Sequence, residues 1–336
     1  DGEGLVDLAA AGLLDPSGLT RYAATLDGEA GAWASVAASD ARLVLTDTNR
    51  LRARRWGTVR ENTGYTEQPG AGPLLEDPAD ARLDVFPGES TGAQTVAQLH
   101  GVSSVRATGY GNPVSFTPED RPANALDGDT ATAWRVGAFA SVEGEKLRVE
   151  LAAPVTTGSL HLVQPLSGAR NRWITRLRLR FDGRSTVDVD LDDSSRTPEG
   201  QTVTFPARRF GLLELEVLGD NVGRRARYDG LSGVGLAEVA IGDVRVDEVL
   251  RLPTDLLDAM GDRSAGHPLD VVMTRLRADP AEPVRSDEEP TIKRTFSLPA
   301  ARSFTVGGTL RIAPDAPDEL IDEVVGAPGL DQGAPI

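Results

Sequence analysis

Cysteine is absent from this chain of 336 residues, which excludes disulfide bonds and thiolate metal sites. Aromatic residues are scarce at 5 %, so few side chains offer a flat face to a ligand. No hydrophobic run approaches the roughly 18 residues that a membrane-spanning helix needs. No basic stretch followed by an apolar one marks a signal peptide. These absences exclude an integral membrane protein for this piece of sequence alone.

Positive charge is in the minority, with 35 basic against 51 acidic residues and a net charge of −16. This balance argues against a nucleic-acid partner, because the phosphate backbone would be repelled. Only Lys146 and Lys293 are lysines, and this arginine bias is typical of a GC-rich genome. The proportions of apolar and charged residues, 40 % and 26 %, are those of a globular protein of one large domain or two. The chain opens on Asp1 rather than Met, which indicates an excised fragment.

The hydrophobic pattern divides the chain into three parts. Residues 1–94 mix helical spacing with a short apolar run at 41–47, which predicts a small α/β segment followed by a linker. Residues 95–250 show strict alternation between turns rich in Gly, Pro and Asp, which predicts an antiparallel β-sandwich without long helices. Residues 251–336 are expected to hold a helix at 255–260 and further strands at 269–276, 292–298 and 304–312.

One loop carries the strongest chemical signal. Asp127 and Asp129 flank Gly128, which permits a tight turn, and Thr132 adds a hydroxyl and a carbonyl. Hard oxygen ligands in a flexible loop suit Ca²⁺. The alternative is an ordinary turn, because this short motif is common.

The wider pattern resembles the coagulation factor V/VIII type C, or discoidin, family, which includes carbohydrate-binding modules of bacterial glycan enzymes. The resemblance rests on the sequence 125–134, the strand that ends at Phe181-Asp182-Gly183, and the late segment 236–241. It implies an eight-stranded jelly-roll sandwich over about 95–250 with one structural Ca²⁺. The ligands that it implies are Asp127, Asp129 chiefly through its carbonyl, Thr132, Glu238, and backbone oxygens near Leu126 and Ala237.

Several other segments resemble the soluble C-terminal region of the actinobacterial α-(1→3)-arabinofuranosyltransferases. They are residues 1–4, 43–50, 110–111, 118–123 and 284–290. These enzymes are membrane proteins that build cell-wall arabinan, as in arabinogalactan and lipoarabinomannan, from decaprenyl-phosphoryl arabinose. The resemblance implies an ectodomain on the extracytoplasmic (periplasmic) face of the membrane, whose partners are a cell-wall glycan and the missing membrane-embedded transferase domain.

Sugar binding needs aromatic faces and planar polar groups, preferentially in loops. Three predicted loops of the sandwich supply such side chains. The candidate contacts are Tyr110, Asn171, Arg172, Trp173, Asn221, Arg225 and Tyr228. Packing in the core or at a strand edge is the alternative for each aromatic residue.

No motif in the sequence indicates an active site. The three histidines have no catalytic motif around them, and the paired carboxylates lie in turn-like sequence that does not resemble the active site of a hydrolase. We therefore expect no catalytic site in this fragment, although the parent resembles a glycosyltransferase. The leading expectation is a glycan-binding accessory region. The alternatives are a purely structural or partner-binding sandwich, and a carbohydrate-binding module of a glycoside hydrolase.

Overall fold

The structure is a computed structural model. It describes residues 6, 8–9, 12–14, 18–51, 64, 66–69, 91–111, 117–137, 141–223, 230–274 and 292–308. Residues 1–300 form one unit and 301–336 a second, of which 301–308 are described. The α-helices are α2 Ala23–Leu26, α3 Ala32–Ala37 and α4 Asp255–Met260. The strands are β1 Leu43–Thr46, β2 Val96–His100, β3 Val102–Ala107, β4 Trp134–Val136, β5 Lys146–Val163, β6 Ile174–Phe181, β7 Ser185–Asp190, β8 Gln201–Asp220, β9 Val234–Leu236, β10 Glu238–Ala240, β11 Asp247–Arg251, β12 Leu269–Val272 and β13 Arg294–Thr295.

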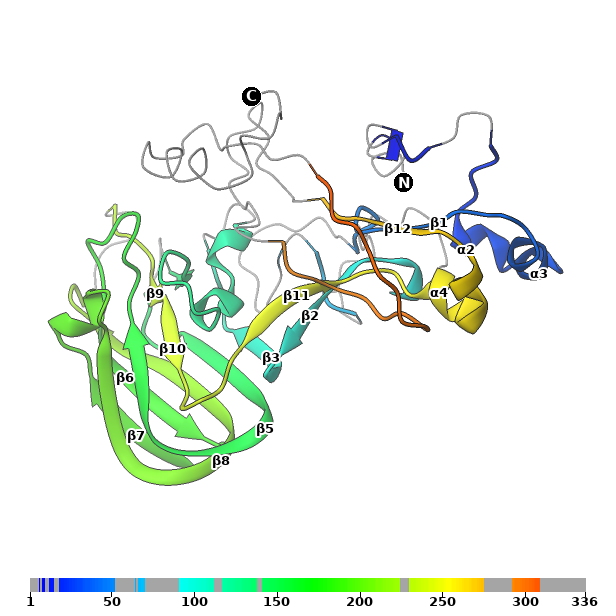
Figure 1. The fold of residues 1–336 in the computed structure, drawn as a ribbon. Coiled ribbons are helices and arrows are strands. Elements are labelled where there is room, and N and C mark those ends of the chain that lie inside the picture. Colours follow the sequence, from blue (N-terminus) through cyan, green and yellow to red (C-terminus); the bar gives the residue numbers. More distant parts are fainter. Residues whose placement is uncertain are drawn as a thin grey trace. The chain divides into compact units, whose positions relative to one another are not determined.

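Strands β5 and β8 form the centre of the larger part of the fold. They contain 18 and 20 residues and run antiparallel, from Lys146 opposite Glu216 to Leu162 opposite Gln201. The register shifts twice between residues 150 and 159. Such irregularities bend strands, and both ribbons curve strongly in Figure 1. Each strand therefore contributes its two halves to different parts of the sheet.

The other strands are added on both sides of this pair. The first half of β5 pairs with β3 and the second half with β10, while β6 pairs with β8 and then β7 with β6, all antiparallel. The alternating residues that face inward build one continuous core, whose largest side chains include Trp134, Phe181 and Phe210. The described residues between 100 and 250 hold three 3-10 turns and no α-helix. The expected antiparallel β-sandwich is therefore confirmed.

The Asp182-Gly183 turn behaves as its sequence predicts. Both residues have positive φ, 49° and 68°, a conformation that Asp and Gly tolerate best. Arg184 N donates to Phe181 O, closing the hairpin between β6 and β7. The Asp182 carboxylate also accepts hydrogen bonds from the backbone amides of Gly211 and Leu212, which ties the turn to the bend in β8.

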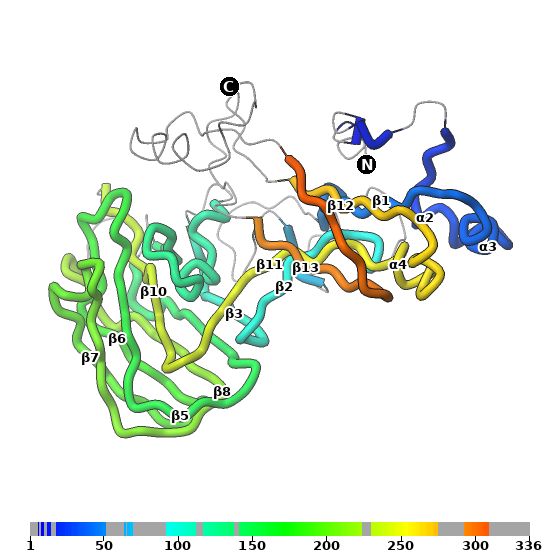
Figure 2. Tube along the Cα trace, in the orientation of Figure 1, coloured from blue at the N-terminus to red at the C-terminus, as the bar shows by residue number. Residues whose placement is uncertain are grey.

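The pieces that flank the sandwich in sequence meet in space. β1 pairs in parallel with β12, and β11 pairs with β2 and, in parallel, with β13. Figure 2 shows β2, β11 and β13 running together. Leu43 and Leu45 share a core with Leu257 and Met260 of α4. The predicted first and last segments thus contribute to one small α/β layer. No described helix is both long and apolar enough to cross a membrane.

The expected helix at 255–260 and the strand within 41–47 are confirmed. Two other strands are shorter than expected. The strand expected at 269–276 ends at Val272, and the strand expected at 292–298 spans only Arg294–Thr295. Of the strand expected at 304–312, the described residues 304–308 are not a strand. Alternation alone overestimated these lengths because it does not show where a pairing partner ends.

A buried ion pair joins the two flanking segments. Asp47, just after β1, is fully buried, and its Oδ2 atom accepts a hydrogen bond from Arg294 Nε. Its Oδ1 atom accepts hydrogen bonds from Thr274 N and Oγ1, both at 2.9 Å. Arg50 Nη2 lies 3.7 Å from Asp47 Oδ2. The side chains of Arg50 and Arg294 are 4 % and 2 % exposed. Removing one partner would leave the other charge buried without full compensation.

Arg294→Ala is therefore expected to lower the free energy of unfolding by about 3–5 kcal/mol, measured by chemical denaturation together with hydrogen exchange at the amides of β1. The matched control is Lys293→Ala, because Lys293 pairs with Asp247 while the two side chains are 42 % and 49 % exposed. That change is expected to cost less than about 1 kcal/mol. Equal effects of the two substitutions would contradict the role given to the buried pair.

Candidate functional site

The loop that carries the predicted ion ligands is closed by its own polar groups. Gly128 has a φ of 78°, in the left-handed region that favours glycine. The Asp127 carboxylate accepts hydrogen bonds from Asp129 N at 2.9 Å and from Thr132 Oγ1 at 2.7 Å. Thr132 Oγ1 also lies 3.0 Å from the carbonyl oxygen of Asp129 and 3.4 Å from that of Asn124. Carboxylate, hydroxyl and carbonyl oxygens thus converge on one side of this turn.

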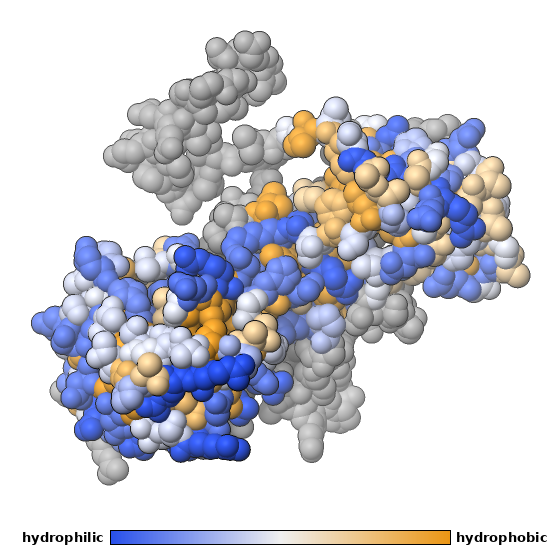
Figure 3. Space-filling model, turned by 60° about the horizontal axis from the view of Figure 1, so that its bottom comes forward, coloured by the Kyte–Doolittle hydropathy of each residue, from blue (hydrophilic) through white to orange (hydrophobic). Residues whose placement is uncertain are grey.

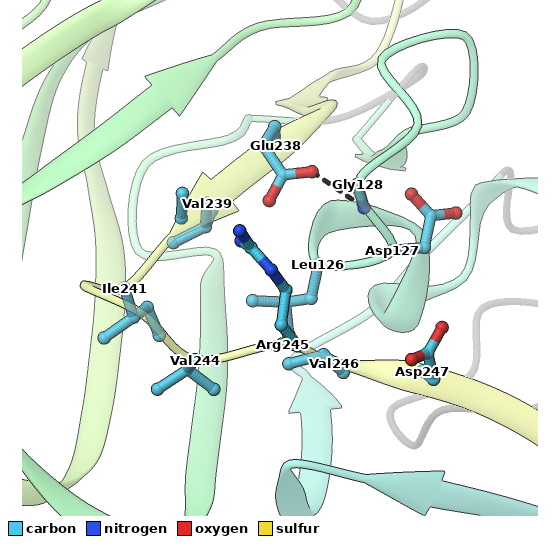
Figure 4. Close-up of a pocket in the computed structure, with 11 residues that line it drawn as sticks. Leu126, Asp127, Gly128, Glu238, Val239, Ile241, Val244, Arg245, Val246 and Asp247 are labelled. Carbon is cyan, nitrogen blue, oxygen red and sulfur yellow. Dashed lines mark hydrogen bonds between the residues drawn. The ribbon is translucent and has the colours of Figure 1, made fainter.

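Glu238 reaches this loop from β10, 110 residues later in the chain. Strand β10 pairs with the end of β5, where Glu238 is opposite Val163. Its Oε2 atom accepts a hydrogen bond from Gly128 N at 3.0 Å (Figure 4). The structure thus brings together the early loop and the late strand that the family resemblance had linked.

Two carboxylates in this corner have unfavourable surroundings. Burial raises the pKa of Asp127 above its ordinary value, although hydrogen bonds from Asp129 and Thr132 oppose the change. Burial, and secondly the negative charge of Asp127, raise the pKa of Glu238 to about 7. A cation bound between them would relieve both effects, because opposite charge favours the ionised form.

The donor set fits a hard cation. Asp127, Thr132 and Glu238 are brought together, with neighbouring carbonyl oxygens of Asn124 and Asp129. The Asp129 carboxylate accepts a hydrogen bond from Ala131 N, and its carbonyl oxygen accepts hydrogen bonds from Thr132 N and Oγ1; its role as a carbonyl ligand stays a prediction. In the part of the chain that the structure describes, no three His, Asp or Glu side chains form a metal-binding group, so an ion here would depend on neutral oxygens as well. Ca²⁺ is the common ion that accepts such a mixture.

The two predicted backbone ligands have different positions. Leu126 is 5 % exposed and lines a pocket beside Asp127. Ala237 is fully buried, and its N donates to Val163 O at 2.7 Å. In the sequence, Leu126 precedes Asp127 and Ala237 precedes Glu238.

The predicted sugar-binding loops do meet at one end of the sandwich. Gly111 N donates to the carbonyl oxygen of Arg135, and Arg135 in turn donates to Ser167. Asn171 Nδ2 donates to Gly230 O. The described parts of the first two loops are therefore connected through Arg135 of β4, and those of the second and third through Asn171.

Most of the predicted sugar contacts are used inside the protein. Tyr110 is 2 % exposed and packs in the sandwich core, so the prediction that it offers a face to a sugar is wrong. Arg172 is buried and paired with Asp220, with 2.6 Å between Nε and Oδ2. Asn171 and Asn221 hydrogen-bond the backbone of neighbouring loops through both amide atoms. These polar side chains hold the loops together.

Trp173 stays half-buried, with the Arg196 guanidinium 4.1 Å from its ring centre. This contact occupies one face of the ring, so a sugar could stack only on the other face. The predicted contacts Arg225 and Tyr228 lie outside the described residues. The sugar-binding role of Trp173, Asn171, Arg172, Asn221, Arg225 and Tyr228 stays a prediction.

Three arginines, Arg176, Arg178 and Arg180, form a stripe along β6 that is paired with acidic neighbours. Arg176 and Arg178 pair with Asp188, and Arg180 with Glu214 and Glu216. In the space-filling view, hydrophilic residues cover much of the sandwich and border a hydrophobic strip (Figure 3). The stripe is thus one half of an ion-paired face.

A pocket that sequence reasoning missed opens beside the Asp127 loop. It has a volume of about 130 Å³ and lies between residues 126–128 and the segment 238–247. Arg245 extends into it toward Glu238 (Figure 4). The run Val244-Arg245-Val246-Asp247 has the pattern of an ordinary alternating strand, so no motif indicated this pocket.

Comparison with known proteins supports the resemblance inferred from the motifs. No family model matches the chain. A curated α-(1→3)-arabinofuranosyltransferase of Mycobacterium tuberculosis is 27 % identical over 196 residues. The match covers 52 % of this chain and 13 % of that protein, so the chain corresponds to a small part of its relative. The predicted resemblance to these transferases is confirmed.

Solved structures with a related arrangement include the arabinofuranosyltransferase AftD from Mycobacteria, at 17 % identity and a TM-score of 0.45, covering 62 % of this chain and 16 % of that one. The family 32 carbohydrate-binding module of AlyQ, in complex with 4,5-unsaturated mannuronic acid, has 16 % identity and a TM-score of 0.31, covering 44 % and 98 %. The family 32 module of NanJ from C. perfringens, in complex with galactose, has 15 % identity and a TM-score of 0.30. That match covers 46 % of this chain and 96 % of the module. All three TM-scores are below 0.5, so the sandwich assignment depends on the strand pairing described above.

The raised pKa of Glu238 predicts how stability changes with pH when a chelator is present. The folded protein holds this proton more tightly than the unfolded chain, whose carboxyl has the ordinary pKa of 4.5. The free energy of unfolding should therefore fall as pH rises from about 4.5 to about 7 and then level off. Allowing for the partial exposure of Glu238, its contribution to this change in the free energy of unfolding is on the order of 2 kcal/mol.

Glu238→Gln is expected to flatten this pH dependence, measured as the free energy of unfolding in urea at several pH values with chelator. The control is Glu143→Gln, because Glu143 is exposed and should leave the profile unchanged. A Glu238→Gln profile that overlays that of the wild type would show that Glu238 is not the titrating group.

Proposed function

We propose that this chain is a glycan-binding accessory region of a membrane arabinofuranosyltransferase. On this proposal it lies on the extracytoplasmic face and holds cell-wall arabinan for the membrane-embedded transferase domain. The observation that carries the proposal is the 27 % identity over 196 residues to an α-(1→3)-arabinofuranosyltransferase. Transfer of arabinose itself is the task of the parent enzyme.

The fold supports a binding role. An antiparallel sandwich holds its loops on a rigid frame, and binding residues are frequent on such loops. The described parts of three loops are joined at one end through Arg135 and Asn171. A ligand held there, or beside the Asp127 loop, would contact backbone that the sandwich keeps in place.

A structural or partner-binding role is the second candidate. It is favoured by the internal contacts of Arg172, Asn171 and Asn221, which leave fewer polar groups for a ligand. On this alternative the sandwich stabilises the ectodomain and binds no sugar.

Ca²⁺ binding at the corner of Asp127, Thr132 and Glu238 belongs to the same proposal. The ion would be held by these side chains and by carbonyl oxygens of the loop, including that of Asp129. Its chemistry there is charge compensation and cross-linking, because it would tie the early loop to the late strand. It would stabilise the fold without contacting a sugar.

The melting temperature of the chain is therefore expected to fall with chelator and to recover with Ca²⁺ more than with Mg²⁺, whose strict octahedral geometry suits this loop poorly. At a hundredfold excess over the dissociation constant, binding adds about 2.7 kcal/mol. Asp127→Ala should abolish the response while the core around Leu43 and Met260 stays folded. A response that survives Asp127→Ala would place the ion elsewhere.

Glycan binding is tested by calorimetric titration of the whole chain with arabinan oligosaccharides, against a linear glucan of equal length as control. Saturable heat with arabinan alone is expected. An absence of heat at every concentration with both glycans favours the structural alternative.

A further inference from the structure

The pocket between the Asp127 loop and the connection from β10 to β11 is lined by polar and apolar groups in about equal measure. Val239 and Ile241 are 1 % and 2 % exposed, and Leu126 is also buried. Val244 and Val246 are half-buried at its edge. Leu126, Val239 and Ile241 belong to the sandwich core, so Val244 and Val246 offer the apolar surface that can pack against the C–H groups of a ligand.

The volume limits the ligand to about one ring. The pocket measures about 130 Å³, and an apolar cavity of about 150 Å³ holds a single benzene ring. A single five- or six-membered sugar ring is of this size. A longer glycan could enter with one residue only.

Arg245 is an available donor at this pocket. It is exposed, and it makes no hydrogen bond or ion pair in the part of the chain that the structure describes. Its guanidinium extends between Leu126 and Glu238 (Figure 4). Five N–H donors on a planar group can bind two neighbouring oxygen atoms at once.

Carboxylates supply the acceptors around the same space. Asp127, Glu238 and Asp247 line the pocket together with Arg245. Asp247 also binds Lys293, with 2.8 Å between Oδ1 and Nζ. With Ca²⁺ held by Asp127 and Glu238, the charged side chains left at the pocket are Arg245 and Asp247, one of each sign. A neutral polyol satisfies both kinds of group, because each hydroxyl both donates and accepts.

We infer that this pocket binds one neutral sugar residue of a glycan, with Arg245 donating to its hydroxyl oxygens and the valine-lined wall contacting its C–H groups. The inference rests on the proposed glycan-binding function and gives it a location. It differs from the loop site predicted around Trp173, where Arg196 covers one face of the ring.

The test titrates the whole chain in Ca²⁺-containing buffer with arabinan oligosaccharides, and then with galactan, mannan and oligouronate fragments. Binding is followed by calorimetry and by amide shifts in two-dimensional NMR. Arg245→Gln removes the charged donor without altering a buried residue, and Val244→Phe fills the edge of the pocket. Arg184→Gln, an exposed arginine on the β6–β7 hairpin, is the matched control. Trp173→Ala and Tyr228→Ala test the loop site.

Arabinan is expected to shift the amides of residues 239–247. Arg245→Gln should weaken binding about tenfold, the effect of one lost charge-assisted hydrogen bond, and Val244→Phe should weaken binding because the larger side chain occupies the edge of the pocket. Arg184→Gln, Trp173→Ala and Tyr228→Ala should leave the affinity unchanged.

If arabinan binds and both pocket substitutions leave its affinity unchanged, the pocket assignment is overturned and the proposed function stands. If galactan or mannan shifts these amides and arabinan does not, the pocket stands and the arabinan proposal fails. If the chain binds oligouronate fragments more tightly than every neutral fragment, the inference that the pocket takes a neutral sugar is overturned. A chain that binds none of the fragments overturns both proposals.

Discussion

The pairing of β5 with β8 is the constraint on which the other features depend. Because both strands bend at the irregularities opposite residues 150–159 of β5, the edge of β5 away from β8 has two neighbours, β3 along its first half and β10 along its second. The loop that follows β3 and β10 itself are thereby brought to the same corner. This is why Gly128 N and Glu238 Oε2 meet although 110 residues separate them. The candidate ion site and the pocket beside it are consequences of this strand order.

Buried polar groups fix how the loops and flanking segments are held. Arg172 with Asp220, and Asp47 with Arg294, are ion pairs with both side chains at most 4 % exposed. Such pairs add little net stability over apolar packing, but one member without the other is costly, so they favour one arrangement of the chain. At the loop end, the side-chain amides of Asn171 and Asn221 also form hydrogen bonds with backbone groups. At the Asp127 corner, in contrast, Asp127 and Glu238 have raised pKa values, and Arg245 makes no hydrogen bond or ion pair with a described residue. The corner is therefore better placed than the loop end to interact with something outside the chain.

The sequence predicted local features better than long-range ones. Alternation identified the strands of the sandwich, and the Asp127 loop and Glu238 were matched through their resemblance to a family. Alternation could not show that 147–151 and 160–163 belong to one bent strand, or that β1 pairs with β12, because period two carries no information about partners. Tyr110 was misjudged because a tyrosine between glycines looks like a surface loop, whereas the neighbouring β4 covers it. Arg245 was missed because its availability depends on which acidic groups fold near it, which only three-dimensional structure shows.

The most direct test of this account is a high-resolution crystal structure of the chain grown with Ca²⁺ and an arabinan oligosaccharide, with anomalous data collected to locate calcium. The account predicts an anomalous peak bounded by Asp127, Thr132 and Glu238, and density for one sugar ring beside Arg245. A map with only water among those three residues, and with no sugar against the wall formed by Val239 and Val244, would contradict it.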